Sequence, residues 1–149
     1  MKKTCVSLAL AALAAASLST AASAAEYEVQ MLNKDSDGQM WQFEPAFLKI
    51  ASGDTVRFVP AEKGHNSEAT ANTIPEGAKP WKGKVNEPIT VTYAREGIYV
   101  YKCLPHAGLG MVGVIQVGES NTNLDDVKNI KMPGKGMSRV AELIAQVGN

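Results

Sequence analysis

From Glu26 onward, hydrophobic and polar residues alternate in short runs, which is the pattern of half-buried β-strands. The run EYEVQML sets Tyr27, Val29 and Met31 on one face against glutamate and glutamine on the other. Similar β-branched and aromatic runs predict further strands at FLKI (47–50), TVRFV (55–59), PITVTYA (88–94), GIYVYKC (97–103) and MVGVIQV (111–117). Residues 61–87, rich in Gly, Pro, Asn and Glu, are predicted to form a loop. Many short strands at this spacing predict a mainly β protein, a Greek-key sandwich of two sheets.

The pattern changes after Gly118, where apolar residues recur at helical spacing. Two short amphipathic helices are predicted from the apolar positions Leu124, Val127 and Ile130, and then Val140, Leu143, Ile144 and Val147. Asn123 and Ser138 belong to the residue types that cap helix starts, so we expect the helices to begin after them. These two C-terminal helices are predicted to close over the sandwich.

Residues 1–24 form a different kind of segment. A positively charged start precedes the apolar or small-residue run Val6–Leu18, and Ala22–Ala24 supplies the small-residue pattern of a cleavage site. The apolar run is too short to span a membrane, and no later run is long enough either. We therefore expect a signal peptide over residues 1–24 that is cleaved on export to the periplasm, no membrane anchor, and one mature domain over residues 25–149.

The chain carries 15 Lys and Arg residues against 15 Asp and Glu residues. Loss of Lys2 and Lys3 with the signal peptide leaves a small negative net charge, and no block of basic residues suggests nucleic acid as a partner. Cys5 would be lost as well, so the exported domain keeps Cys103 as its only cysteine. A lone thiol in an oxidising compartment cannot form an internal disulfide, so it serves metal binding or reactivity, or has no function.

The candidate chemistry lies in the stretch YKCLPHAGLGM, residues 101–111, which places Cys103, His106 and Met111 between two predicted strands. The other histidine, His65, follows a different predicted strand, and loops at one end of a sandwich converge. Two imidazoles, one thiolate and a weak axial methionine form the ligand set of blue-copper electron-transfer sites. Each residue alone has an ordinary structural role, but together they predict a type 1 copper site formed by His65, Cys103, His106 and Met111.

Other classes of site fit the same residues less well. A catalytic cysteine with a histidine base gives Met111 no role, and no oxyanion-hole motif is evident. A structural zinc site favours further cysteines over a methionine. A copper chaperone or storage protein, which trades metal through exposed sulfur ligands, stays open as an alternative. No substrate-pocket signature is present, so we expect a one-electron carrier and not an enzyme.

A series of segments matches one protein family in order: EVQMLNK, SGDTVRFVP, KGHN, IPEGA, KCLPHAGLGM and NLDDVK. On these segments the chain resembles the cupredoxins, and among them the pseudoazurins. The resemblance implies a cupredoxin-like sandwich with two C-terminal helices. It also implies one copper ion held by His65, Cys103 and His106, with Met111 as the axial ligand. The gap between His106 and Met111 is longer than in amicyanin, and an amicyanin-like carrier is the alternative within the family.

The resemblance further implies roles for residues around the site. Asn66 resembles the family asparagine that ties the two ligand loops together by hydrogen bonding. Leu104 offers no side-chain acceptor, so this tie is expected to use backbone groups. His106 is the implied electron port, set in an apolar patch that includes Leu109.

Lysines are expected around this patch: Lys34, Lys63, Lys82, Lys84 and Lys102. A positive face steers an acidic partner toward the protein. The resemblance implies that this partner is a redox protein, such as a copper nitrite reductase or a cytochrome c. It also implies that the carrier is a monomer.

Overall fold

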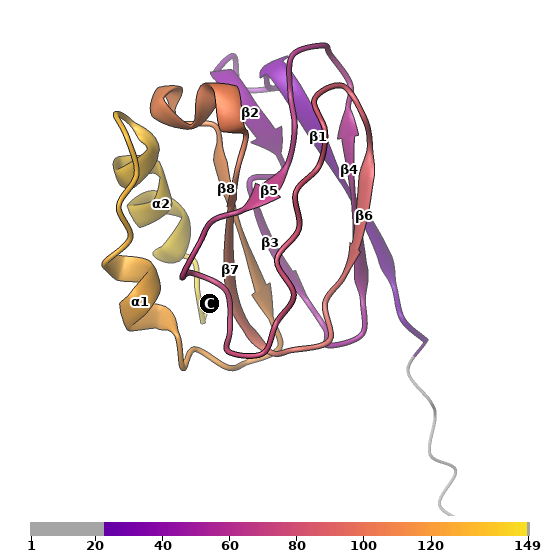
Figure 1. Ribbon diagram of the computed structural model, residues 1–149, viewed down its shortest axis with the longest axis vertical. Helices are drawn as coiled ribbons and strands as arrows, with labels where there is room; N and C mark the ends of the chain where they lie inside the picture. The colour runs from indigo at the N-terminus through magenta and orange to yellow at the C-terminus, as the bar shows by residue number, and fades with distance from the viewer. Residues whose placement is uncertain (1–22, 149) are drawn as a thin grey trace, which may run out of the picture.

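The computed structural model describes residues 23–148, whose strands form two four-stranded sheets packed as a sandwich (Figure 1). The first sheet has the strand order β2-β1-β4-β6. Its strands are β1 (Glu26–Lys34), β2 (Met40–Glu44), β4 (Thr55–Pro60) and β6 (Ile89–Thr92). Strand β1 pairs antiparallel with β2 and parallel with β4, and β4 pairs antiparallel with β6.

The second sheet has the strand order β3-β8-β7-β5. Its strands are β3 (Phe47–Ile50), β5 (Glu68–Ala69), β7 (Gly97–Lys102) and β8 (Val112–Val117). Strand β3 is parallel to β8, whereas β7 is antiparallel to both β8 and β5. The mainly β fold with two sheets confirms the fold class predicted from the sequence.

Alternation along β7 determines which side chains face the inside of the sandwich. Tyr99 and Tyr101, and Cys103 just beyond the strand, belong to the core between the sheets. Ile98 and Val100 point the other way, into a second core that includes the C-terminal helices. Because the strand is covered on both faces, nearly all of its residues are buried. Cys103 therefore reaches the interior as the next inward position of β7.

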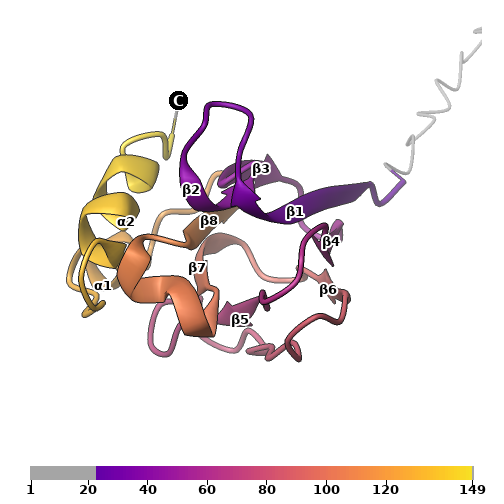
Figure 2. The same cartoon turned by 90° about the horizontal axis from the view of Figure 1, so that it is seen from above.

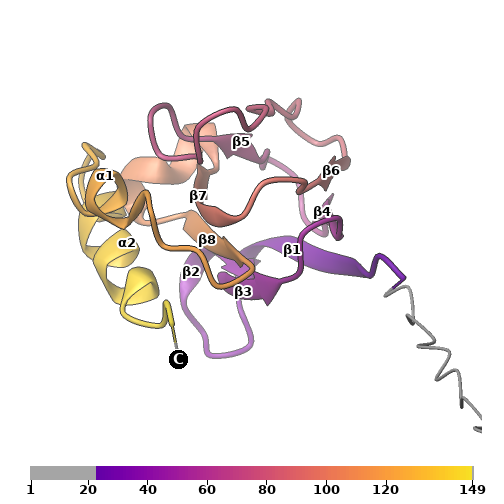
Figure 3. The same ribbon diagram turned by 90° about the horizontal axis from the view of Figure 1, so that it is seen from below.

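Helices α1 (Leu124–Lys128) and α2 (Gly136–Ile144) lie together on one side of the sandwich (Figures 1 and 3). Helix α1 packs on β7, and α2 packs on β8. Their buried residues Val127, Val140 and Leu143 contact the outward side chains of these strands. The two predicted C-terminal helices are confirmed.

The capping predictions need correction. Helix α1 begins directly after Asn123, as predicted, and Asn123 is its N-cap residue, but the Asn123 side chain makes no capping hydrogen bond. Its side chain instead accepts the Ile98 N–H at 3.0 Å and donates to the Ile98 carbonyl at 2.7 Å, which fastens the helix to β7. Ser138 lies inside α2, which begins at Gly136, so the predicted start at Ser138 is wrong. The Ser138 hydroxyl donates to the Lys135 carbonyl at 3.0 Å.

Three short elements have no counterpart in the predicted pattern. Strand β2 does not alternate, because Gln42 and Phe43 are both buried and Trp41 takes the left-handed φ of 61°. Strand β5 is a two-residue strand within the predicted loop 61–87. The 3-10 helix η1 (Leu104–Leu109) lies between β7 and β8. Helix η1 and the start of β2 share one end of the sandwich (Figures 1 and 2).

The predicted signal peptide lies outside the described residues, apart from Ser23 and Ala24. None of the helices within residues 23–148 is long and apolar enough to cross a membrane. Cleavage after Ala24 and the domain boundary at residue 25 stay predictions.

Removal of the buried Ser67 hydroxyl is expected to destabilise the fold. Its oxygen accepts the indole N–H of Trp81 at 3.0 Å. Ser67→Ala leaves that N–H without a partner, which lowers the free energy of unfolding by about 1–3 kcal/mol. Urea unfolding of the metal-free protein measures the loss.

Ser52→Ala is the matched control, because the exposed Ser52 hydroxyl also makes one hydrogen bond, to the Ala94 carbonyl at 3.0 Å. Water replaces that bond when the hydroxyl is lost, so the change in unfolding free energy should stay within about 0.5 kcal/mol. Equal losses in the two variants would contradict the prediction.

Candidate metal centre

The segment between β7 and β8 forms a tight turn that carries Cys103, His106 and Met111. Pro105 lies in the first turn of η1, where no N–H partner is needed. The His106 N–H donates to the Cys103 carbonyl at 3.1 Å, and the Met111 N–H donates to the His106 carbonyl at 3.2 Å. The Cys103 N–H closes the turn by donating to the Met111 carbonyl at 3.0 Å. These backbone bonds fix the relative positions of the three residues.

His65 reaches the site from the loop after β4 and is fully buried. Its carbonyl accepts the Asn86 N–H at 2.9 Å, and the Asn86 side chain accepts the Gly64 N–H at 2.6 Å. Gly64 also lies close to the His106 ring. The bonds to Asn86 therefore fix the loop that carries His65, and this loop passes close to the turn that carries the other candidates.

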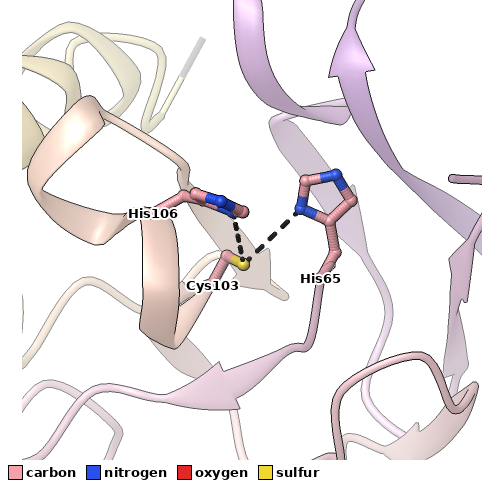
Figure 4. Close-up of side chains that lie close together, drawn as sticks. All are labelled: His65, Cys103 and His106. Atoms are coloured by element: carbon pink, nitrogen blue, oxygen red, sulfur yellow. Dashed lines mark hydrogen bonds between the residues drawn. The ribbon is translucent and has the colours of Figure 1, made fainter. Parts of the chain in front are cut away.

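Three donor atoms face a common point between these segments (Figure 4). Cys103 Sγ lies 3.7 Å from His65 Nδ1 and 3.5 Å from His106 Nδ1. All three atoms lie within 4.8 Å of one another. Met111 is fully buried and belongs to the same core cluster as Cys103. The structure thus brings His65, Cys103 and His106 together and packs Met111 into the cluster that contains the cysteine.

The side chain of Asn33 determines the tautomer of His65, and thus whether the ring nitrogen that faces Cys103 Sγ carries a proton or a free lone pair. The His65 Nε2 atom lies 2.9 Å from the Asn33 side-chain oxygen, which accepts hydrogen bonds and cannot donate them. Nε2 therefore carries the proton, and Nδ1 is free to donate its lone pair to a metal ion. Nothing in the sequence singles out Asn33, because an asparagine at the start of a predicted polar turn gives no sign of a contact with a distant histidine.

Asn66 links the two chain segments of the site. Its Oδ1 accepts the Leu104 N–H at 2.7 Å, at the residue directly after Cys103. Its Nδ2 donates to the Gly83 carbonyl at 3.1 Å and to Glu68 Oε2 at 3.3 Å. The bond to Leu104 uses a backbone group, which confirms what was expected for a leucine at this position.

The Trp41 indole covers one face of the His106 ring. The two ring centroids are 4.3 Å apart with an interplanar angle of 18°, so the rings are stacked. The same indole meets the His65 ring edge-on, with centroids 6.0 Å apart. The left-handed backbone of Trp41 is unusual for a bulky residue, and such conformations gather at functional sites. Trp41 thus supports both imidazoles, a role that the sequence pattern did not predict.

Burial controls the protonation of the site in the metal-free chain. Burial lowers the pKa of His65. The neighbouring His106 lowers that pKa further, and Glu62 opposes the decrease. Burial also lowers the pKa of His106. The pKa of the Cys103 thiol is raised, mainly by burial, while hydrogen bonds from the Asn66 and His106 backbone oppose the rise. The imidazoles are therefore neutral at neutral pH, and a bound cation would displace the thiol proton.

This donor set suits a transition-metal ion. Imidazole nitrogen binds several such ions, and thiolate sulfur selects soft ones such as copper(I). The buried thioether of Met111 offers a further soft donor in the same cluster. The hydrogen bond between His65 and Asn33 is the kind of support that orients metal-binding imidazoles in proteins. The residues present therefore fit copper.

Comparison with known proteins also points to copper binding. Residues 29–118, more than half of the chain, match the copper binding proteins of the plastocyanin/azurin family. A pseudoazurin of Paracoccus pantotrophus is 48% identical over 141 residues, which cover 95% of this chain and 97% of the relative. A solved pseudoazurin from Sinorhizobium aligns with a TM-score of 0.81 and 49% identity, over 84% of this chain and 98% of that one. A solved pseudoazurin from Hyphomicrobium denitrificans aligns with a TM-score of 0.79 and 43% identity, over 83% of this chain and 99% of that one.

The matched range contains all four candidate ligands, His65, Cys103, His106 and Met111. The resemblance predicted from the sequence segments is confirmed. The chain belongs to the copper-binding plastocyanin/azurin family and, within it, to the pseudoazurins.

Proposed function

We propose that this chain is a type 1 (blue) copper protein that carries single electrons between redox partners in the periplasm. We assign His65, Cys103 and His106 as its strong copper ligands and Met111 as the axial ligand. The observation that carries the proposal is the approach of Cys103 Sγ and two histidine Nδ1 atoms to within 4.8 Å of one another. Membership of the pseudoazurins supports an electron carrier rather than an enzyme.

Bound copper supplies the chemistry, because it gains and loses one electron between its cuprous and cupric forms. The protein holds the donor atoms in place. Backbone bonds inside the turn fix Cys103 relative to His106 and Met111, and the Asn66–Leu104 bond fixes the turn relative to the loop of His65. Donor atoms that keep their positions in both oxidation states leave little to rearrange, and electron exchange is fast as a result.

His106 is the proposed electron port. His65 and Cys103 are fully buried, whereas His106 is partly exposed. In the part of the chain that the structure describes, the exposed large hydrophobic side chains are Met40, Val85, Leu104, Leu109 and Met137. Leu104 and Leu109 are the first and last residues of η1, the element that carries His106. An apolar surface beside the imidazole suits a brief contact between proteins.

We infer that exposed lysines make this end of the protein attractive to an acidic partner. Those predicted from the sequence and exposed in the structure are Lys34, Lys63, Lys82 and Lys84. Lys135 adds to them, because its N–H donates to the Gly108 carbonyl of η1 at 3.0 Å. Lys102 differs from the others because it is half-buried. It is paired with Glu68, and the exposed Lys84 is paired with Glu87. We infer that the monomer docks here with an acidic redox partner, a copper nitrite reductase or a cytochrome c.

A copper chaperone is the rival function. Such a protein exchanges its metal through exposed sulfur atoms, but Cys103 and Met111 are both fully buried in this structure. The burial of both sulfur-bearing side chains favours a carrier that keeps its ion.

Cys103→Ser is expected to abolish the colour of the copper-loaded protein. Cu(II) should give the parent chain a strong visible band in the orange-red, because that band requires a bond between thiolate and copper. Absorption and paramagnetic-resonance spectra measure the difference. Met132→Leu changes a buried methionine in the core beneath the helices, so this control should keep the band. A colourless parent chain, or a coloured serine variant, would refute the ligand assignment.

Electron exchange with an acidic redox partner is expected to slow as ionic strength rises, because salt screens the attraction between opposite charges. Stopped-flow measurement of the bimolecular rate constant tests this. Lys84→Gln should lower the rate at low salt. Lys49→Gln removes a lysine from β3, which pairs with the end of β8 farther from η1, and should have a smaller effect. A rate constant that is flat or rises with salt would rule out electrostatic docking.

A further inference from the structure

We propose that Glu68 and Lys102 form a partly buried charge pair that sets the reduction potential of the copper site, with Glu68 lowering the potential and Lys102 raising it. The inference rests on the proposed function, because it requires a bound copper ion. It extends that function by giving a role to two residues that are not ligands.

The Glu68–Lys102 pair is the most buried ion pair within residues 23–148. Lys102 Nζ lies 3.6 Å from Glu68 Oε1, and the two side chains are 26% and 10% exposed. Every other ion pair contains a side chain at least 49% exposed: Lys49–Glu119, Arg57–Glu28, Lys84–Glu87 and Arg139–Glu142. Water and salt screen those exposed charges strongly, whereas the field of a buried charge persists.

Strands β5 and β7 place the pair next to the candidate sulfur ligand. Glu68 lies opposite Lys102 in the antiparallel register of the two strands, and Lys102 directly precedes Cys103. Glu68 Oε2 also accepts a hydrogen bond from Asn66 Nδ2 at 3.3 Å, and Asn66 in turn binds the N–H of Leu104. Glu68 is thus connected to both chain neighbours of Cys103.

Stability alone does not account for a buried pair in this position. The loss of hydration of two charges offsets most of their mutual attraction, so a buried ion pair contributes little net stability compared with apolar residues. A pair beside a redox ion has a further effect, because each of its charges interacts unequally with the oxidised and the reduced ion.

The sign of each effect follows from Coulomb's law. Cu(II) carries more positive charge than Cu(I), so the Glu68 carboxylate stabilises the oxidised form and lowers the potential. The Lys102 ammonium destabilises the oxidised form and raises the potential. The two effects oppose each other in the parent chain, and removal of either charge leaves the other acting alone.

Glu68→Gln, Lys102→Gln and the double variant test the proposal. Glutamine keeps the size of Glu68 and an oxygen that accepts the Asn66 bond. Voltammetry of the copper-loaded proteins should show an upward shift for Glu68→Gln and a downward shift for Lys102→Gln. The reduction potential of the double variant should be closer to that of the parent chain than the potential of either single variant. Glu119→Gln breaks an exposed ion pair with Lys49 and should leave the potential unshifted.

Shifts in the same direction in both single variants, or a shift in neither, would overturn the proposal. Amide hydrogen exchange at Leu104 in the metal-free chain separates charge from a loosened turn. The Leu104 amide should stay protected from exchange in Glu68→Gln. An exchange rate about tenfold higher than in the parent chain, the size expected for a lost hydrogen bond, would overturn the electrostatic account. A parent chain without a visible copper band overturns the proposed function itself, whereas a coloured chain with unshifted variants overturns only this inference.

Discussion

The hydrogen bond from the Leu104 N–H to Asn66 Oδ1 is the contact on which the site depends. It joins segments 38 residues apart in the sequence, one carrying His65 and the other carrying Cys103 and His106. Neither segment brings enough donor atoms alone, since one supplies a single imidazole and the other supplies a thiol and an imidazole. A fixed link between them sets the spacing of the donors before any ion arrives, so little conformational freedom is lost when the ion binds.

Strand periodicity supplies the rest of the arrangement. Strand β7 directs Tyr101 and then Cys103 toward the inside of the sandwich, and it directs Val100 toward the helices. A slip of one residue in the pairing of β7 would exchange these two sets and carry the sulfur to the wrong face. Helices α1 and α2 oppose such a slip, because Val127 and Val140 are buried against the outward side chains of the sheet. Helices without a candidate ligand therefore still serve the site.

Much of this arrangement is visible in the sequence. The alternating runs correctly predict β1 and β4, and the β-branched and aromatic runs correctly predict β7 and β8. The predicted meeting of His65 with Cys103 is confirmed, since loops at one end of a sandwich converge. Contacts that depend on tertiary structure leave no such signal. Trp41 interrupts the alternation of its own strand with a left-handed backbone, and Glu68 lies in a two-residue strand inside a predicted loop. Ser138 has the chemistry of a cap, but α2 begins two residues earlier, at Gly136, and packs against β8.

The indole of Trp41 lies flat on one side of the His106 imidazole, so a visiting molecule meets that ring only along its edge or over its uncovered side. Redox partners are then selected by their orientation as well as by their charge. A small reagent can react from many orientations and is little affected by the indole, whereas a large protein must approach within a narrow range of orientations. Selectivity among redox partners can therefore depend on an aromatic side chain that does not contact the ion.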